Sequence, residues 1–198
     1  MKLPLLLGIG LLALQPQGTR YVPETGWERN DWAAQFYENW YGGQLRAMRE
    51  PSISSVGKLQ GFQTRFRLLV VPNYDPARAY RIDLTRGGSA RLRWVQLDGA
   101  GGYLPGRIAK HGSRVLTRPE LEAFRTALKS AALHLLRREP ESEAEPTTIC
   151  LHATHYVFEQ LDEQGHHFVT RENCEVEESL QRLRAFLSEF APQPKGRR

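Results

Sequence analysis

The feature that most constrains the fold of this chain is an alternation of apolar and polar side chains in three consecutive segments, residues 61–71, 79–84 and 89–97. A period of two places alternate side chains on opposite faces of an extended chain, which is typical of strands with one buried face. The segments therefore predict three antiparallel strands. The side chains predicted to face the core are Phe62, Thr64, Phe66, Leu68 and Val70, then Tyr80, Ile82 and Leu84, then Ala90, Leu92 and Trp94.

The loop between the second and third strands is predicted to contain three residues, Arg86-Gly87-Gly88. A two-residue turn of Gly87 and Gly88 would set Leu84 opposite Arg91 and place an apolar residue on the face of a charged one. A three-residue loop pairs Leu84 with Ala90 instead, and it gives Gly88 the left-handed conformation that such loops require. The same register pairs Ile82 with Leu92, Tyr80 with Trp94, Asp83 with Arg91, and Arg81 with Arg93.

Residues 30–49 are predicted to form an aromatic N-terminal helix. Trp32, Phe36 and Trp40 follow one another at intervals of four, the spacing of one helix face. The pair Gly42-Gly43 predicts a kink or a division into two short helices. We expect the aromatic stripe to pack in the core, and a ligand groove is the alternative.

Two further helices are predicted in the second half of the chain. Thr117 and Glu120 have the spacing of a capping box, which begins a helix that extends to about Arg138. The apolar spacing in residues 176–190 predicts the last helix, for which Asn173 is a candidate cap.

The remaining segments complete a single domain of the α+β class. Residues 149–161 and 166–173 predict a second hairpin, with Leu161 opposite His166. The expected fold is an antiparallel sheet of five or six strands packed by two or three helices. The helices that begin at Thr117 and Val176 are expected to cover one face, and the aromatic N-terminal helix to flank the sheet.

Residues 1–18 have the layout of a secretory signal: Met1-Lys2, an apolar run to Leu14, and a break at residues 15–18. The apolar run is shorter than the roughly 20 residues that span a bilayer, so we expect removal, with an uncleaved anchor as the alternative. The expected location is the periplasm or the medium. The folded domain is predicted over residues 19–191, followed by a disordered basic tail at residues 192–198.

The two cysteines, Cys150 and Cys174, are predicted to form a disulfide, because an even count in an exported protein is typical of a bridge. The alternative is a pair of buried, reduced side chains. The formal charge of +5 favours anionic partners. Export removes nucleic acid from that set, and an anionic envelope component or an acidic protein remains.

Five arginines are predicted to share the outward face of the first three strands, with Asp83 as the one carboxylate among them. The guanidinium group is suited to carboxylates and phosphates, so this face is a candidate binding surface. The alternatives are a solvated face and a face covered by the protein's own helices. The five are Arg65, Arg67, Arg81, Arg91 and Arg93.

The segment from Asp98 to Gly106 is predicted to be a shaped surface loop or a loop that inserts into a partner. A phosphate-binding glycine loop requires a helix directly after it, and Pro105 and an extended run follow here instead. The candidate binding residues in this loop are Asp98, Gly101, Gly102 and Tyr103.

We predict no catalytic residue, no cofactor and no metal site. No serine lies in a nucleophile elbow, although a triad assembled from distant residues leaves no such pattern. His152 and His155 differ in strand parity, and His166 lies about 20 Å along the hairpin from His155 at about 3.3 Å per residue. These histidines therefore do not have the spacing of a zinc site.

Two motifs resemble a group of small exported proteins of Gram-negative bacteria. The resemblance covers roughly residues 40–190, and it carries no activity and no functional residue with it. The first motif comprises Trp40-Tyr41, Leu45, Met48 and Glu50-Pro51-Ser52-Ile53, and the second comprises Leu97 to Tyr103 with Pro105-Gly106.

The function expected from these features is that of an exported, non-enzymatic binding protein. One version is an inhibitor or immunity-type protein that blocks a toxin or hydrolase. A second is a binder of anionic components of the cell envelope. An envelope enzyme is the third.

Overall fold

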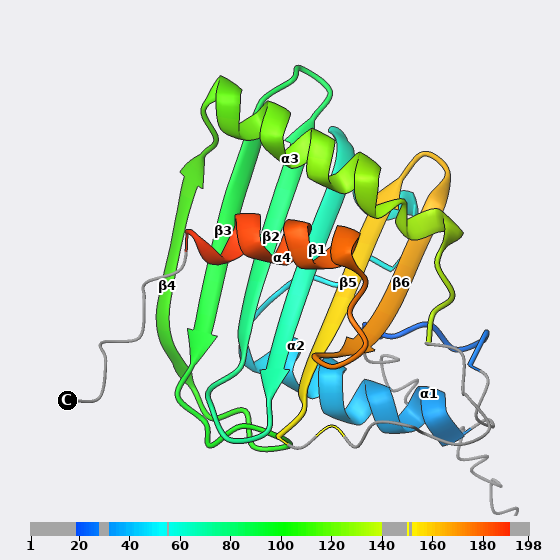
Figure 1. Cartoon of the computed structure of the whole chain (residues 1–198), viewed down its shortest axis with the longest axis vertical. Coiled ribbons are helices and arrows are strands. Elements are labelled where there is room, and N and C mark those ends of the chain that lie inside the picture. The colour runs from blue at the N-terminus through cyan, green and yellow to red at the C-terminus, as the bar shows by residue number, and fades with distance from the viewer. Residues whose placement is uncertain (1–18, 28–31, 55, 140–149, 151, 191–198) are drawn as a thin grey trace, which may run out of the picture.

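The computed structural model describes residues 19–27, 32–54, 56–139, 150 and 152–190, which form one α+β domain, as predicted (Figure 1). Six antiparallel strands make a single sheet in the order β4-β3-β2-β1-β5-β6. The strands are β1 Phe62–Pro72, β2 Arg78–Thr85, β3 Ala90–Leu97, β4 Ile108–Val115, β5 Thr154–Asp162 and β6 Gly165–Glu172. The helices are α1 Trp32–Tyr37, the π-helix η1 Glu38–Gly42, α2 Gly43–Ala47, the 3-10 helices η2 Val56–Leu59 and η3 Leu133–Leu135, α3 Arg118–Ala131 and α4 Glu178–Ser188.

The predicted register of the β2–β3 hairpin is confirmed. Leu84 lies opposite Ala90, and the other predicted pairs lie opposite one another as well. The loop is closed by a hydrogen bond from Thr85 N to Ser89 O of 2.8 Å, which leaves three residues in the turn. Gly88 has φ of +80°, the left-handed conformation that the parity argument requires.

The second hairpin also has the predicted pairing, with Leu161 opposite His166. Its first strand begins later than predicted, at Thr154. At this edge of the sheet, Thr170 N donates a hydrogen bond of 2.7 Å to Arg138 O, so the segment after η3 covers part of β6. At the other edge, β4 pairs with β3 alone among the described strands.

Helices α3 and α4 cover one face of the sheet, as predicted (Figure 1). Phe66, Ile82 and Leu92 of the sheet pack there against Phe124 and Leu183 of the two helices. The core on this face is therefore built largely from the side chains that the alternation assigns to the inside. The prediction is wrong for Phe62, because a register shift between Phe62 and Thr64 lets it pack with Leu59 and Leu161 instead.

The helix termini differ in part from the predicted ones. The capping box of α3 is present, with Thr117 N donating to Glu120 Oε2 at 2.8 Å. The helix ends at Ala131 and not near Arg138, because Ala132 adopts a left-handed conformation with φ of 44°. Helix α4 begins at Glu178, and Asn173 does not cap it, since its side chain accepts a hydrogen bond from Thr154 N instead.

The N-terminal helices, which were predicted to flank the sheet, lie on its opposite face and cover part of it. Trp40, Tyr41 and Leu45 pack on Leu69 and Val157 in a second core. The predicted irregularity at Gly42-Gly43 takes the form of the π-helical turn η1, which leads directly into α2. The sheet is therefore buried on both faces at the end where the β1–β2 and β3–β4 loops lie.

The predicted signal segment, residues 1–18, and the predicted basic tail, residues 192–198, lie outside the described residues. Among the described residues, no helix has both the length and the apolar composition needed to cross a bilayer.

The β2–β3 loop gives a direct test of the register argument. Replacing Gly88 with Ala should lower the free energy of unfolding by about 1 kcal/mol, because a Cβ disfavours the left-handed conformation although the surrounding space is open. Gly43 is the matched control, since it has φ of −59° and also has open space around it. Gly43→Ala should raise the free energy of unfolding by about 0.5–1 kcal/mol in the same urea titration. Equal effects of the two substitutions would contradict the assigned loop.

Candidate functional site

The predicted arginine face is not a single exposed surface. Arg65, Arg67 and Arg81 are buried, and the side chain of Arg67 is 0% exposed. The expectation of five exposed arginines is therefore wrong for these three. The alternative of a covered face holds for them, because the segment from Glu50 to Leu59 and the residues around Tyr21 lie over this part of the sheet.

Arg67 forms a fully buried ion pair with Glu159 of the neighbouring strand. Its Nε donates to Glu159 Oε2 at 2.6 Å, and one terminal nitrogen donates to Pro51 O at 2.7 Å. Burial alone would raise the pKa of Glu159, but the charge of Arg67, together with hydrogen bonds from His166 and Arg67, holds that pKa below its usual value. Both charges of the pair are therefore satisfied inside the protein.

The other two buried arginines share one carboxylate. Arg65 Nε donates to Asp83 Oδ1 at 2.8 Å, and Arg81 Nε donates to Asp83 Oδ2 at 3.0 Å. Arg81 also forms an ion pair with Glu50. We call these six residues the buried ion network; it comprises Arg65, Arg67, Arg81, Glu50, Asp83 and Glu159. It contains three positive and three negative groups, so it is a structural element and not a surface for an external anion.

Arg91 and Arg93 remain exposed, as predicted. They lie on the same face as the network, on the part of β3 next to the edge strand β4. Arg91 lies 3.5 Å from the hydroxyl of Ser113. These two arginines are the part of the predicted anion-binding face that stays accessible.

The loop from Asp98 to Gly106 is held in a fixed conformation by its neighbours. Asp98 Oδ1 accepts a hydrogen bond of 2.7 Å from Arg107 N, which closes the base of the loop. Gly101 has φ of +90°, and a Cβ there would lie 2.8 Å from the backbone of Asn73. Gly102 N donates to Pro72 O at 2.8 Å, so the loop is attached to the end of β1.

The N-terminal helix fixes the same loop from the other side. Trp40 Nε1 and Gln44 Nε2 both donate to Gly102 O, at 2.9 and 3.0 Å. The ring of Tyr103 lies 4.7 Å from that of Trp40. The two sequence motifs at Trp40 and at residues 97–106 therefore contact each other directly.

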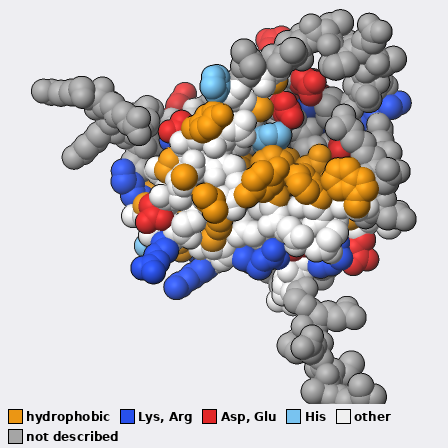
Figure 2. All heavy atoms as spheres, turned by 90° about the horizontal axis from the view of Figure 1, so that it is seen from below, with side chains coloured by type: hydrophobic (Ala, Val, Ile, Leu, Met, Phe, Trp, Pro, Cys, Tyr) orange, Lys and Arg blue, Asp and Glu red, His pale blue; other side chains and the backbone are white. Residues whose placement is uncertain are grey.

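These contacts create an exposed apolar surface, which we call the aromatic platform. Successive ring pairs connect Trp32, Phe36, Trp40 and Tyr103 at centroid distances of 4.7–6.1 Å. Trp32 is 57% exposed, Tyr103 63% and Leu104 67%, whereas Trp40 is buried. The platform comprises Trp32, Phe36, Trp40, Tyr103 and Leu104. Figure 2 shows hydrophobic side chains gathered in a band on this face, with Lys and Arg side chains along one edge.

The predicted core packing of the aromatic stripe is thus correct for Trp40 and wrong for Trp32. The exposed position of Trp32 is a feature of the candidate site that the spacing did not predict. A stripe of three large rings at intervals of four was the available signal, but spacing alone does not show which of the rings stays exposed.

His155 lies beneath the platform, with its ring 4.5 Å from that of Trp40. Its Nδ1 is 3.5 Å from the Tyr41 hydroxyl and 3.8 Å from Glu172 Oε1. Burial lowers the pKa of His155 to about 4, and the partly exposed Glu172 does not offset this effect. Burial likewise raises the pKa of Tyr41, so both groups are neutral near pH 7.

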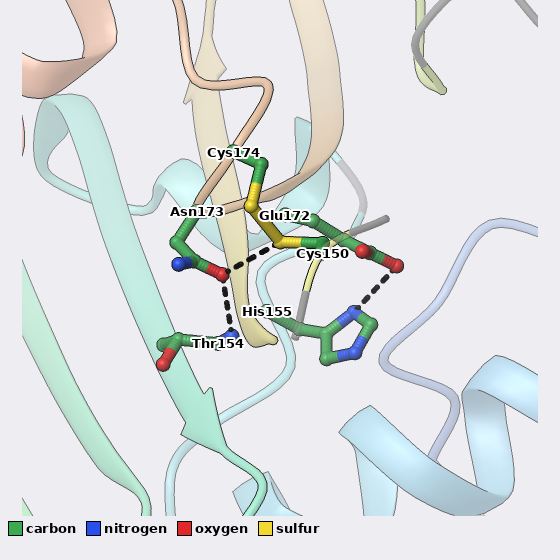
Figure 3. The surroundings of a disulfide bond; sticks show 6 residues. All are labelled: Cys150, Thr154, His155, Glu172, Asn173 and Cys174. Carbon is green, nitrogen blue, oxygen red and sulfur yellow. Dashed lines mark hydrogen bonds and ion pairs between the residues drawn. A yellow bond between two sulfur atoms is a disulfide. The ribbon is translucent and has the colours of Figure 1, made fainter. Parts of the chain in front are cut away.

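Cys150 and Cys174 form a disulfide next to His155, as predicted (Figure 3). The bridge connects the chain before β5 to the chain after β6, with Cα atoms 6.0 Å apart. Asn173 Oδ1 accepts a hydrogen bond of 2.9 Å from Thr154 N. The start of β5, which carries His155, is therefore connected to the end of β6 both by the disulfide and by a hydrogen bond.

Among the described residues, no group of three or more His, Cys, Asp or Glu side chains is placed to hold a metal ion. His155 contacts Tyr41 and Glu172 only at 3.5 and 3.8 Å, and the Tyr41 side chain is buried. This group of three side chains therefore does not present a nucleophile to solvent. What this region offers chemically is recognition by rings, a fixed loop and nearby guanidinium groups.

Comparison with known proteins adds no assignment to these residues: no protein-family model matches the chain, and no curated protein matches it at a significant level. The aromatic platform is the candidate site on geometry alone.

The Arg67–Glu159 pair predicts strong coupling between its partners. Arg67→Met alone should lower the free energy of unfolding by about 3–5 kcal/mol, because Glu159 would remain fully buried without its guanidinium partner and with His166 as its neighbour. The double variant with Glu159→Met should lose clearly less than the sum of the two single variants in urea titrations. Additive losses would contradict a direct pair.

The pKa of His155 predicts a loss of stability in mild acid. Because this pKa is lowered from 6.5 to about 4, the unfolded chain binds a proton between these values that the folded protein does not. The free energy of unfolding should therefore fall by about 1–2 kcal/mol from pH 7 to pH 5. His155→Gln should remove most of this decrease, and His111→Gln, at an exposed histidine, should retain it. An unchanged decrease in the His155 variant would contradict the assignment.

Proposed function

We propose that this protein is an exported, non-enzymatic binding protein that recognises a folded protein partner through the aromatic platform, in the manner of an inhibitor or immunity protein acting on a toxin or hydrolase. The observation that carries the proposal is the exposure of Tyr103, Leu104 and Trp32 on a surface whose loop is fixed from below. The signal-like residues 1–18 and the disulfide support export, because disulfides persist in oxidising compartments.

Exposed aromatic residues that are fixed in place are typical of protein interfaces. Trp and Tyr are enriched among the few side chains that provide most of the binding energy. A loop that is already ordered loses little conformational entropy when a partner binds. Tyr103 meets both conditions, since its ring rests on Trp40 and the loop is hydrogen-bonded to two elements.

The charge around the platform favours an acidic partner. Arg49 and Arg107 are exposed on the segments that adjoin it, and the chain carries a formal charge of +5. Opposite charges at the rim of an interface increase the association rate and exclude partners of like charge. The partner that fits is a protein with an apolar depression bordered by Asp and Glu side chains.

Affinity capture with matched variants tests this function. The tagged protein, Tyr103→Ala and Val115→Ala are each incubated with envelope extract of the host organism, and retained proteins are identified and quantified by mass spectrometry. Val115 is the control because it is also exposed but lies at the opposite end of β4.

The expected result is one protein retained in stoichiometric amount by the wild type and Val115→Ala, and lost with Tyr103→Ala. With the purified partner, Tyr103→Ala should raise the dissociation constant at least 30-fold, which corresponds to about 2 kcal/mol. If the partner is an enzyme or toxin, its activity should fall in a one-to-one titration with the wild type. Equal retention by Tyr103→Ala and the wild type would refute the platform as the binding surface.

A further inference from the structure

A shallow groove of about 520 Å³ lies beside the aromatic platform, where α2 ends and β4 begins. Arg49 approaches it from the helix, and Arg107 and His111 approach it from the loop and strand, over a floor that includes Ala47 and Ile108. All three polar side chains are exposed, and neither arginine forms an ion pair with another described residue. Within the part of the chain that the structure describes, the groove therefore presents two guanidinium groups without a carboxylate partner, together with an imidazole.

The two carboxylates nearest in sequence to these arginines differ in their effect on the groove. Glu50, next to Arg49, forms its ion pair with Arg81 in the buried ion network. Asp98 accepts a hydrogen bond from the backbone N of Arg107 and lies against Gly106, so its carboxylate offsets part of the positive charge at the edge of the groove. The two arginines still give the described lining of the groove an excess of positive charge.

The backbone of Arg49 gives an independent reason to assign a role to its side chain. The helix ends in a Schellman motif, in which Arg49 N donates to Arg46 O and Glu50 N donates to Leu45 O, both at 3.0 Å. Arg49 occupies the left-handed position of this motif, with φ of 54°. Glycine is the residue that suits this position, and non-glycine residues in strained conformations cluster at functional sites.

The positive surface continues from the groove along the sheet. His111 lies opposite Val95, and Ser113, two residues further along β4 on the same face, lies opposite Arg93. Arg91 follows on β3 at the next position of this face. The accessible remainder of the predicted arginine face therefore adjoins the groove and extends its charge toward the other end of the strand.

We propose that this groove is a binding site for a phosphate group, held by the guanidinium groups of Arg49 and Arg107 with His111 as a further hydrogen-bond donor. Two guanidinium groups that approach from different elements suit the several oxygens of a phosphate, and the apolar floor accommodates the group that the phosphate is attached to. The ligand is a phosphate ester, which is free in solution or part of a lipid headgroup. Arg49 and Arg107 also lie beside the aromatic platform, but phosphate binding in the groove does not require a protein partner.

Arg49→Gly is the decisive variant, because it removes the side chain while placing the preferred residue at the left-handed position. Binding of inorganic pyrophosphate is measured by isothermal titration calorimetry for the wild-type protein, Arg49→Gly, Arg107→Ala and Arg125→Ala. Arg125, which is partly exposed on α3 and paired with Glu122, is the control for the loss of one positive charge away from the groove. The unfolding midpoint of each variant is recorded in parallel.

The expected result is at least a tenfold loss of pyrophosphate affinity for Arg49→Gly and Arg107→Ala, no comparable loss for Arg125→Ala, and an unfolding midpoint for Arg49→Gly that is equal to or above that of the wild type. No binding by the wild type, or equal weakening by Arg49→Gly and Arg125→Ala, would overturn the proposal.

A second measurement separates the two sources of phosphate. The same proteins are sedimented with vesicles of phosphatidylcholine alone and with vesicles in which about 30% of the lipid is phosphatidylglycerol, a fraction that gives a clearly negative surface. Selective binding to the anionic vesicles, lost with Arg49→Gly, would identify a lipid headgroup as the ligand. Pyrophosphate binding without vesicle binding would identify a soluble phosphate ester.

Discussion

The buried ion network determines how the N-terminal third of the chain is arranged. Charges that are removed from water must find partners of opposite sign, or the protein loses several kcal/mol for each of them. Arg67 and Arg81 therefore require Glu159 and Glu50 at their positions on the sheet. Glu50 lies three residues after the end of α2, at the last position of the Schellman motif, so its ion pair attaches the end of the helical segment to the sheet.

The position of Glu50 connects the buried ion network to both proposed sites. Arg49 precedes Glu50 and lies at the groove. Trp40 and Gln44, earlier in the same helical segment, donate to the carbonyl of Gly102 and hence hold the loop that carries Tyr103. The network itself binds no ligand in either proposal. Its contribution is to give exposed side chains a rigid support, which a recognition surface needs if binding is not to be opposed by the entropy of ordering it.

The sheet was largely predictable from the sequence, whereas the covered face was not. The parity of Leu84 and Arg91 determined the loop length and hence the register, because a shift of one residue reverses the faces of a strand. Alternation shows that Arg67 and Arg81 share a face, but it does not show whether the chain returns to cover it. Their partners lie 92 and 31 residues away. The signals that were present were Leu69 and Val71, which continue the arginine face as apolar residues, and Glu159, a lone acid in an otherwise apolar part of β5.

The two edges of the sheet are protected by different physical means. The β6 edge is partly occupied by the chain itself, through the hydrogen bond from Thr170 to Arg138. The β4 edge pairs only with β3 among the described strands, and it carries Lys110, His111 and Arg114. Charge is a common defence of an open edge against sheet-to-sheet association, and dissolved salt screens it. The β6 edge is therefore protected by a hydrogen bond within the chain, which salt does not screen, whereas charge at the β4 edge acts with a strength that depends on ionic conditions.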